Sequence, residues 1–167
     1  MEMLHYAKEA LTTKFATFSG RARRREYWLF VLFTAIINSA INFMTLAVKD
    51  STPLTVVISI ISIVWGLYTS IPSIAITVRR LHDTNRSGWW YLLAIVFIFA
   101  MVIFAVLQFN SSNYIFLILA FLCFAGFLAY VVFLFLPGTK GENDYGPDPK
   151  AVADAPEAND SQIEIKF

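Results

Sequence analysis

The chain has 167 residues, of which 57% are hydrophobic and 15% are charged, whereas soluble domains carry about 25% charged residues. This composition excludes an ordinary water-soluble fold and indicates a protein that places much of its surface in lipid. The net charge is only +1, so a nucleic-acid partner is not expected, although basic and acidic residues are segregated along the chain.

Residues 1–20 are predicted to form an amphipathic helix. Apolar residues recur at steps of three or four and would share one face: Leu4, Ala7, Leu11, Phe15 and Phe18. Lys8 and Lys14 flank this face, where their stems can lie on lipid while their ammonium groups reach phosphates. We expect this helix to lie in the membrane interface; a helix packed on a partner protein or on a loop of the same chain would show the same pattern.

Residues 21–139 are predicted to form a domain of four transmembrane helices. The four apolar stretches are 27–48, 52–78, 89–109 and 114–136. Each supplies the roughly 20 residues that an α-helix needs to cross a hydrocarbon core of about 30 Å. The predicted fold class is therefore all-α, a polytopic membrane protein.

Residues 140–167 are predicted to be an acidic, flexible tail. This segment contains seven acidic residues and three lysines. It begins with a stretch rich in proline and glycine and shows no apolar periodicity, which is typical of turns and of disordered chain.

The basic residues predict the orientation of the four spans. Of the 13 lysines and arginines, only Lys49 would lie on the side opposite the two termini. Because lysine and arginine in short flanking segments stay in the cytoplasm, both termini and the loop between the second and third spans are predicted to be cytoplasmic.

Polar residues recur on one face of each of the first two spans. They are Thr34, Asn38, Asn42 and Thr45 in the first, and Ser59, Ser62, Gly66, Ser70, Ser73 and Thr77 in the second. Small and polar residues favour close contact between membrane helices, so these two faces are predicted to meet. The same residues could instead line a polar pathway.

Two basic motifs precede aromatic pairs at the predicted cytoplasmic boundary. Arginines at such a boundary can meet lipid phosphates, while tryptophan and tyrosine rings fix the depth of the helix. The residues predicted to bind headgroups or a partner protein are Arg21, Arg23, Arg24, Arg25, Tyr27, Trp28, Arg79, Arg80, His82, Asp83, Arg86, Trp89 and Trp90.

His82 and Asp83 are the one candidate acid–base pair. Adjacent helical residues point about 100° apart, so the two are not expected to contact each other. No nucleophile or metal-binding group accompanies them in the sequence, and salt bridges from Asp83 to Arg79, Arg80 or Arg24 are the favoured interpretation. We therefore predict no catalytic residue, no metal site and no cofactor.

Three motifs in order resemble a known family. They are G-R-x-x-R-x-E-Y-W at residues 20–28, R-R-L-H-D-x-x-x-S-G-W-W at residues 79–90, and N-x-Y-G-P-D-P at residues 143–149. Together they resemble domain of unknown function 805, a bacterial family of small inner-membrane proteins. The resemblance covers residues 18–149 and implies an inner (plasma) membrane location, but it carries over no function and no catalytic residues.

The leading hypothesis is a non-enzymatic interaction module. Its partners would be membrane lipids, especially anionic ones, and either a second protein or further copies of the chain. An oligomeric transporter or channel subunit is the first alternative, and an enzyme acting on a lipid phosphate is the second.

Overall fold

The computed structural model describes residues 1–109, 111 and 113–154. The described residues form six helices in chain order: α1 (Glu2–Leu11), α2 (Arg24–Ala47), α3 (Thr52–Asp83), α4 (Trp89–Phe109), α5 (Ile115–Phe135) and α6 (Pro149–Asp154). No strand occurs among the described residues. The predicted all-α fold is confirmed.

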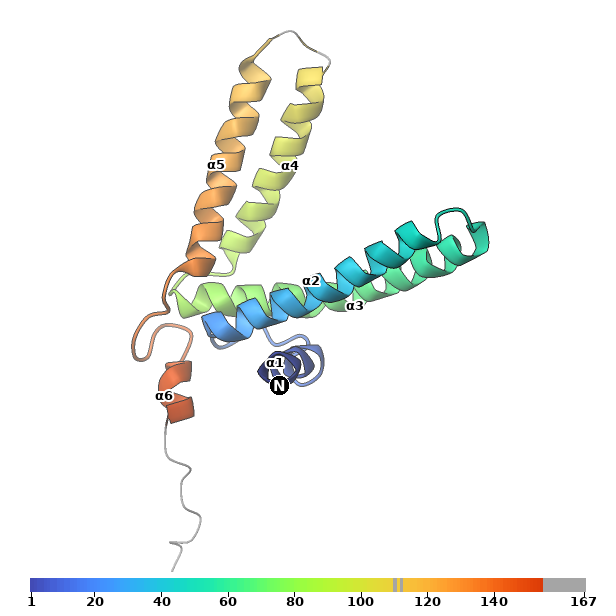
Figure 1. The fold of residues 1–167 in the computed structure, drawn as a ribbon. Coiled ribbons are helices and arrows are strands. Elements are labelled where there is room, and N and C mark those ends of the chain that lie inside the picture. Colours follow the sequence, from blue (N-terminus) through green and yellow to red (C-terminus); the bar gives the residue numbers. More distant parts are fainter. Residues whose placement is uncertain (110, 112, 155–167) are drawn as a thin grey trace, which may run out of the picture.

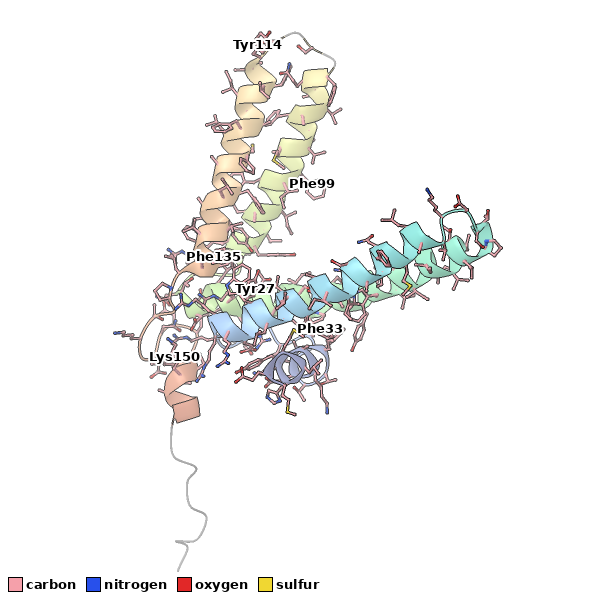
Figure 2. The ribbon with its side chains drawn as sticks, in the orientation of Figure 1. Tyr27, Phe33, Phe99, Tyr114, Phe135 and Lys150 are labelled. Atoms are coloured by element: carbon pink, nitrogen blue, oxygen red, sulfur yellow. The ribbon has the colours of Figure 1, made fainter. Side chains whose placement is uncertain are left out.

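The four predicted spans are present as α2, α3, α4 and α5, each long and apolar enough to cross a membrane. Helices α2 and α3 lie side by side as one hairpin and α4 and α5 as a second, and the two hairpins diverge from a common end (Figure 1). Only 6% of the most apolar window of each helix is buried inside the protein. Many of the exposed residues are large and apolar, as lipid contact requires; Phe99, labelled in Figure 2, is 65% exposed.

The protein core lies where the helices come together. Its buried apolar residues are Ala10, Ala22, Tyr27, Phe30, Ile76, Leu81, Ala94, Tyr130 and Leu134, drawn from α1 to α5 and the segment before α2. We call this region the junction; it comprises residues 20–23, the N-terminal end of α2, the C-terminal ends of α3 and α5, and residues 137–149. Figure 2 shows Tyr27 and Phe135 within it.

Helix α3 continues past the predicted end of its span to Asp83. The added residues carry the R-R-L-H-D motif, and they stay helical because they are buried in the junction rather than exposed at a membrane surface. The helix stops where Asn85 adopts a left-handed conformation, with φ of 57°, which asparagine tolerates better than most residues.

The amphipathic helix is shorter than predicted. Helix α1 ends at Leu11. The hydroxyls of the next two residues, Thr12 and Thr13, donate hydrogen bonds back to the carbonyls of Lys8 and Glu9. Ala7 and Ala10 are buried because α1 packs against α2 and α3. Of the predicted apolar face, Ala7 is buried in this contact, whereas Leu4 and Phe18 are 61% and 44% exposed.

The predicted polar faces of α2 and α3 interact less than expected. Asn38 Oδ1 accepts a hydrogen bond from Trp65 Nε1 at 3.0 Å, and the side chain of Thr77 is hydrogen-bonded to that of Tyr27. The hydroxyls on these faces bond instead to carbonyls of their own helix: those of Thr34, Thr45, Ser59, Ser70, Ser73 and Thr77. A short hydroxyl is satisfied locally in this way and has no need of the neighbouring helix.

The first part of the predicted acidic tail makes contacts with the membrane domain. Residues 140–148 pack against the C-terminal end of α3, where Asn143 Nδ2 donates to the carbonyl of His82 at 3.0 Å. Residues 149–154 form α6. The rest of the predicted tail, residues 155–167, lies outside the described residues.

Candidate functional site

Arg21 fastens the C-terminal segment to the end of α3. Its side chain is 1% exposed, and its Nη2 lies 3.0 Å from Asp83 Oδ1. The same guanidinium donates to the carbonyls of Thr139, Gly141 and Gly146, at 2.5, 2.7 and 3.3 Å. A guanidinium has five donors in a fixed fork, so one arginine can hold a carboxylate and several loop carbonyls together.

Arg80 makes a second buried set of contacts around the same carboxylate. Its side chain is fully buried, and Nη1 donates to Asp83 Oδ2. Nε donates to the carbonyl of Leu134 at 3.1 Å, and Nη2 donates to that of Leu136. Asp83 thus pairs with two arginines, and these contacts join the end of α3 to the end of α5. The predicted salt bridge from Asp83 to Arg80 is present; the partner that the sequence did not identify is Arg21.

Arg79 pairs with Glu26 rather than with Asp83. The distance from Arg79 Nη1 to Glu26 Oε1 is 3.0 Å, and both side chains are buried. Lys14 lies 3.7 Å from the same carboxylate oxygen. This interaction ties α3 to the first turn of α2 and to the segment that follows α1.

His82 is held by backbone and aromatic contacts. Its Nδ1 lies 3.1 Å from the carbonyl of Gly20, and its ring stacks on Tyr145 with centroids 3.8 Å apart. Asp83 is occupied by its two arginines, so the two residues do not form an acid–base pair. Within the described part of the chain, no three His, Cys, Asp or Glu side chains gather as metal ligands would.

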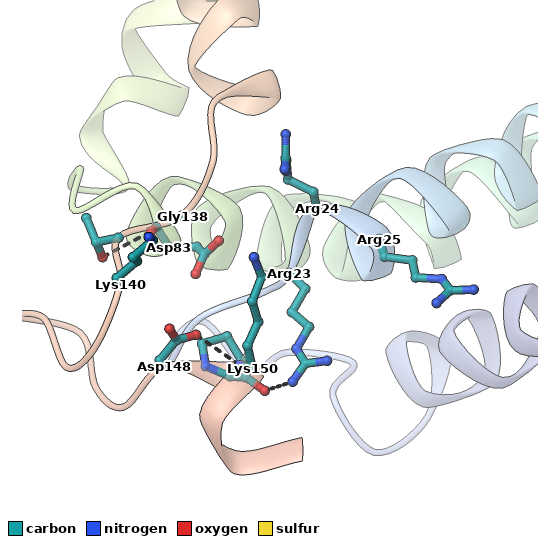
Figure 3. A pocket seen from close by; sticks show the side chains of 10 residues that line it. Arg23, Arg24, Arg25, Asp83, Gly138, Lys140, Asp148 and Lys150 are labelled. Carbon is teal, nitrogen blue, oxygen red and sulfur yellow. Dashed lines mark hydrogen bonds between the residues drawn. The ribbon is translucent and has the colours of Figure 1, made fainter. Parts of the chain in front are cut away.

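The remaining predicted arginines are accessible. Arg23, Arg24 and Arg25 line a cavity of about 440 Å³, together with Asp83, Gly138, Thr139, Lys140, Asp148, Pro149 and Lys150 (Figure 3). Arg23 donates to the carbonyl of Pro149, and Arg24 donates to that of Phe135 at 3.3 Å. Arg25 forms an exposed ion pair with Glu2.

The charge of this cavity is strongly positive. Five basic side chains line it against two carboxylates, and Asp83 is already neutralised by Arg21 and Arg80. Asp148 accepts hydrogen bonds from the backbone N–H groups of Lys150 and Gly141. The bond from Lys150 lowers the pKa of Asp148, so this carboxyl is ionised at neutral pH.

The aromatic residues of the motifs take different positions. Tyr27 is buried in the core, whereas Trp28 packs on Phe135 with ring centroids 4.3 Å apart. Trp89 is 75% exposed, and Trp90 meets the edge of Phe133. The guanidinium of Arg86 lies 4.0 Å from the Phe133 centroid, and Arg86 is not among the residues that line the cavity.

The structure therefore divides the thirteen predicted residues into two groups. Arg21, Tyr27, Arg79, Arg80, His82 and Asp83 are buried and hold the junction together. Arg23, Arg24, Arg25, Trp28, Arg86, Trp89 and Trp90 have accessible side chains. Lys140 and Lys150 line the cavity but were not among the predicted residues; their position on either side of the N-x-Y-G-P-D-P motif is the signal that could have identified them.

Comparison with known proteins gives a family and several relatives. The family described as "Protein of unknown function (DUF805)" matches residues 15–147. Inner membrane protein YhaI of Escherichia coli (strain K12) is 38% identical over 133 residues, which cover 80% of this chain and 86% of the relative. Inner membrane protein YhaH of the same strain is 34% identical over 133 residues, covering 80% and 87%.

A third relative and the solved structures complete the comparison. Uncharacterized protein YiiR of Escherichia coli (strain K12) is 29% identical over 143 residues, covering 81% of this chain and 88% of the relative. No solved structure gives a significant match. The family match contains the first two motifs in full and the first five residues of the third, which runs from 143 to 149. The chain therefore belongs to the DUF805 family and is a polytopic membrane protein.

Proposed function

We propose that the protein is a non-enzymatic interaction module of the bacterial inner membrane whose basic cavity binds the phosphate of an anionic lipid headgroup. The observation that carries the proposal is the excess of basic side chains around one cavity. Four of the five are not paired with a carboxylate, since Arg25 pairs with Glu2, and Asp148 is the one lining carboxylate that is not paired with an arginine. Guanidinium and ammonium groups are the side chains that bind phosphate oxygens.

The place of the cavity in the fold favours a lipid over a soluble anion. Arg24 reaches the carbonyl of Phe135, which is the last residue of α5, so the cavity lies at the end of an apolar helix. Trp28 packs on Phe135 beside it, and tryptophan is enriched at the membrane–water interface. A headgroup phosphate in the cavity would leave its acyl chains free to follow the exposed apolar faces of the helices.

The cavity is proposed to face the cytoplasm. With α2 to α5 crossing the membrane, Lys49 is the one basic residue in the described part of the chain that lies at the opposite end of the spans. The positive-inside rule then places the junction and both chain ends on the cytoplasmic side. The cytoplasmic leaflet of many membranes carries anionic lipid, which each nearby lysine or arginine attracts by about 1 kcal/mol.

The test compares two double variants with equal changes of charge. Arg24→Gln with Lys150→Gln removes two basic groups from the cavity, whereas Lys49→Gln with Arg86→Gln removes two outside it. Native mass spectrometry would measure binding of phosphatidylglycerol and of phosphatidylethanolamine with the same acyl chains. The cavity variant is expected to bind phosphatidylglycerol about 30-fold more weakly, from two contacts of about 1 kcal/mol each.

Three results would contradict the proposal. The two double variants could lose phosphatidylglycerol equally, which would make the effect one of net charge alone. Phosphatidylethanolamine could bind the parent protein as tightly as phosphatidylglycerol, which would remove the headgroup preference. Inorganic phosphate could displace the bound lipid at an equal concentration, which would assign the cavity to a soluble anion.

A further inference from the structure

Helix α2 carries unpaired amide groups at the depth of the hydrocarbon core. Asn38 lies at the centre of the predicted span 27–48, and Asn42 lies one turn further along. Asn38 Oδ1 accepts from Trp65, but its two amide N–H groups have no acceptor among the described residues. Asn42 is exposed and makes no hydrogen bond to any described residue. Polar groups at this depth are costly unless another protein group satisfies them.

Asn42 belongs to a regular stripe on the exposed side of α2. Its members follow one another at steps of three, four, three and four: Leu32, Ala35, Ser39, Asn42 and Leu46. All five are exposed, and Leu32 and Leu46 are 50% and 69% accessible. The less exposed residues Thr34, Ile37, Ile41 and Thr45 lie on another side of the helix, toward α3. Alternating steps of three and four are the repeat by which two helices pack at a shallow crossing angle.

The second hairpin of the same chain cannot satisfy Asn42. Apart from Cys123, residues 92–107 of α4 and 115–129 of α5 contain no side chain with a hydrogen-bonding group other than weakly accepting methionine sulfur. A second copy of α2 does offer a complement, because an amide has both donors and an acceptor and therefore pairs with an identical amide. Ala35 and Ser39 are small, so two helix backbones can approach closely there.

We infer that the protein self-associates in the membrane through α2, with Asn42 paired to its counterpart in a second copy. Copies inserted with the same orientation are related by a two-fold axis along the membrane normal, so the two α2 helices run parallel and like residues meet. The small residues let the helices touch, and the amide pair fixes their register, as a single asparagine does in the seam of a coiled coil. This inference uses a different part of the molecule from the basic cavity and does not depend on it.

The geometry is tested by cysteine crosslinking of the full chain in native membranes. Cys123→Ser first removes the one native thiol. Into this background Ser39→Cys places a thiol on the stripe, and Ile41→Cys places the matched control near the same depth, about 200° away around the helix. Oxidation is expected to give a disulfide-linked dimer from Ser39→Cys and monomer from Ile41→Cys. Equal dimer yields from the two variants, or no dimer from Ser39→Cys, would overturn the inference.

The role of the amide is tested in the Ser39→Cys background. Asn42→Leu is expected to lower the dimer association constant about tenfold, as loss of a polar pair does between model membrane helices. Asn42→Gln keeps an amide and should retain most of the crosslinking. Thr45→Leu also replaces a polar residue by leucine, but on the side of α2 toward α3, and should leave the yield of crosslinked dimer unchanged. Unchanged crosslinking in Asn42→Leu would refute the role of the amide.

A further measurement separates this inference from the proposed function. Asn42→Leu is expected to bind phosphatidylglycerol as tightly as the parent, because Asn42 is distant in the chain from every residue that lines the basic cavity. The inference of self-association can therefore be refuted while the proposed lipid binding is upheld, and the proposed lipid binding can be refuted while self-association is upheld.

Discussion

Asp83 is predicted to be the residue on which the stability of the junction depends most. Its Oδ1 lies 3.0 Å from Arg21 Nη2, and its Oδ2 accepts from Arg80. The three side chains are at most 7% exposed. Asp83→Asn preserves the shape of the side chain but leaves two buried guanidinium groups without their negative partner.

The expected cost follows from the burial of the pair. Removal of one partner from a buried ion pair costs about 3–5 kcal/mol, because the other charge is left uncompensated. The ion pair between Glu2 and Arg25 provides the control, since its side chains are 56% and 66% exposed. Exposed pairs contribute about 0–1 kcal/mol, so Glu2→Gln should change stability little.

The measurement is reversible chemical unfolding in detergent, followed by far-ultraviolet circular dichroism, for the parent and both variants. Total stabilities of proteins are about 5–15 kcal/mol, so a loss of 3–5 kcal/mol would shift the transition clearly. If Asp83→Asn lost no more stability than Glu2→Gln, the interpretation of Arg21, Asp83 and Arg80 as the bond that holds the junction would be wrong.

Three further predictions concern the same region. Gly138→Ala should destabilise the junction, because the new Cβ would lie 2.1 Å from Asp83 Oδ2. Limited proteolysis should then cut residues 137–149 faster than in the parent protein. Gly141→Asn is the control, because no atom lies near its Cβ and asparagine tolerates its φ of 74°. Asp148→Asn should tighten phosphatidylglycerol binding several-fold, since it removes the cavity carboxylate that is not paired with an arginine, whereas Asp144→Asn should have less effect. Native mass spectrometry measures binding to both variants, and equal effects would contradict the proposal that the lipid phosphate binds in this cavity. Tyr145→Ala should increase hydrogen exchange at residues 143–146, because it removes the ring stacked on His82, and unchanged exchange would show that the stack does not hold the loop.

Sequence patterns predicted the transmembrane helices well, because their physical cause is local. A run of about 20 apolar residues must be helical in lipid whatever surrounds it, so α2 to α5 follow from composition and length. The end of α1 was harder to place. Thr12 and Thr13 lie within a pattern of apolar residues at helical spacing that continues to Phe18. The helix nevertheless ends before them, and their hydroxyls bond to carbonyls of its last turns, so the spacing of apolar residues did not reveal the end of the helix.

The burial of the arginines could not be predicted in the same way. Arg21 and Arg23 are two residues apart in one basic motif, yet Arg21 is buried and Arg23 lines the cavity. The difference arises from carbonyls such as that of Gly141, 120 residues further along the chain. A pattern of charges cannot show which arginine will meet those carbonyls, since their position depends on how the whole chain folds.

The bonds of Arg21 also impose an order on the assembly of the protein. Arg21 precedes the first membrane helix, whereas the carbonyls of Thr139, Gly141 and Gly146 follow the last one. During synthesis its guanidinium can meet Asp83 once α3 has been made, but its bonds to these three carbonyls can form only after all four spans have been made. The final step of folding is then the formation of hydrogen bonds between the two ends of the membrane domain. A nascent chain that stalls before residue 139 would lack these bonds.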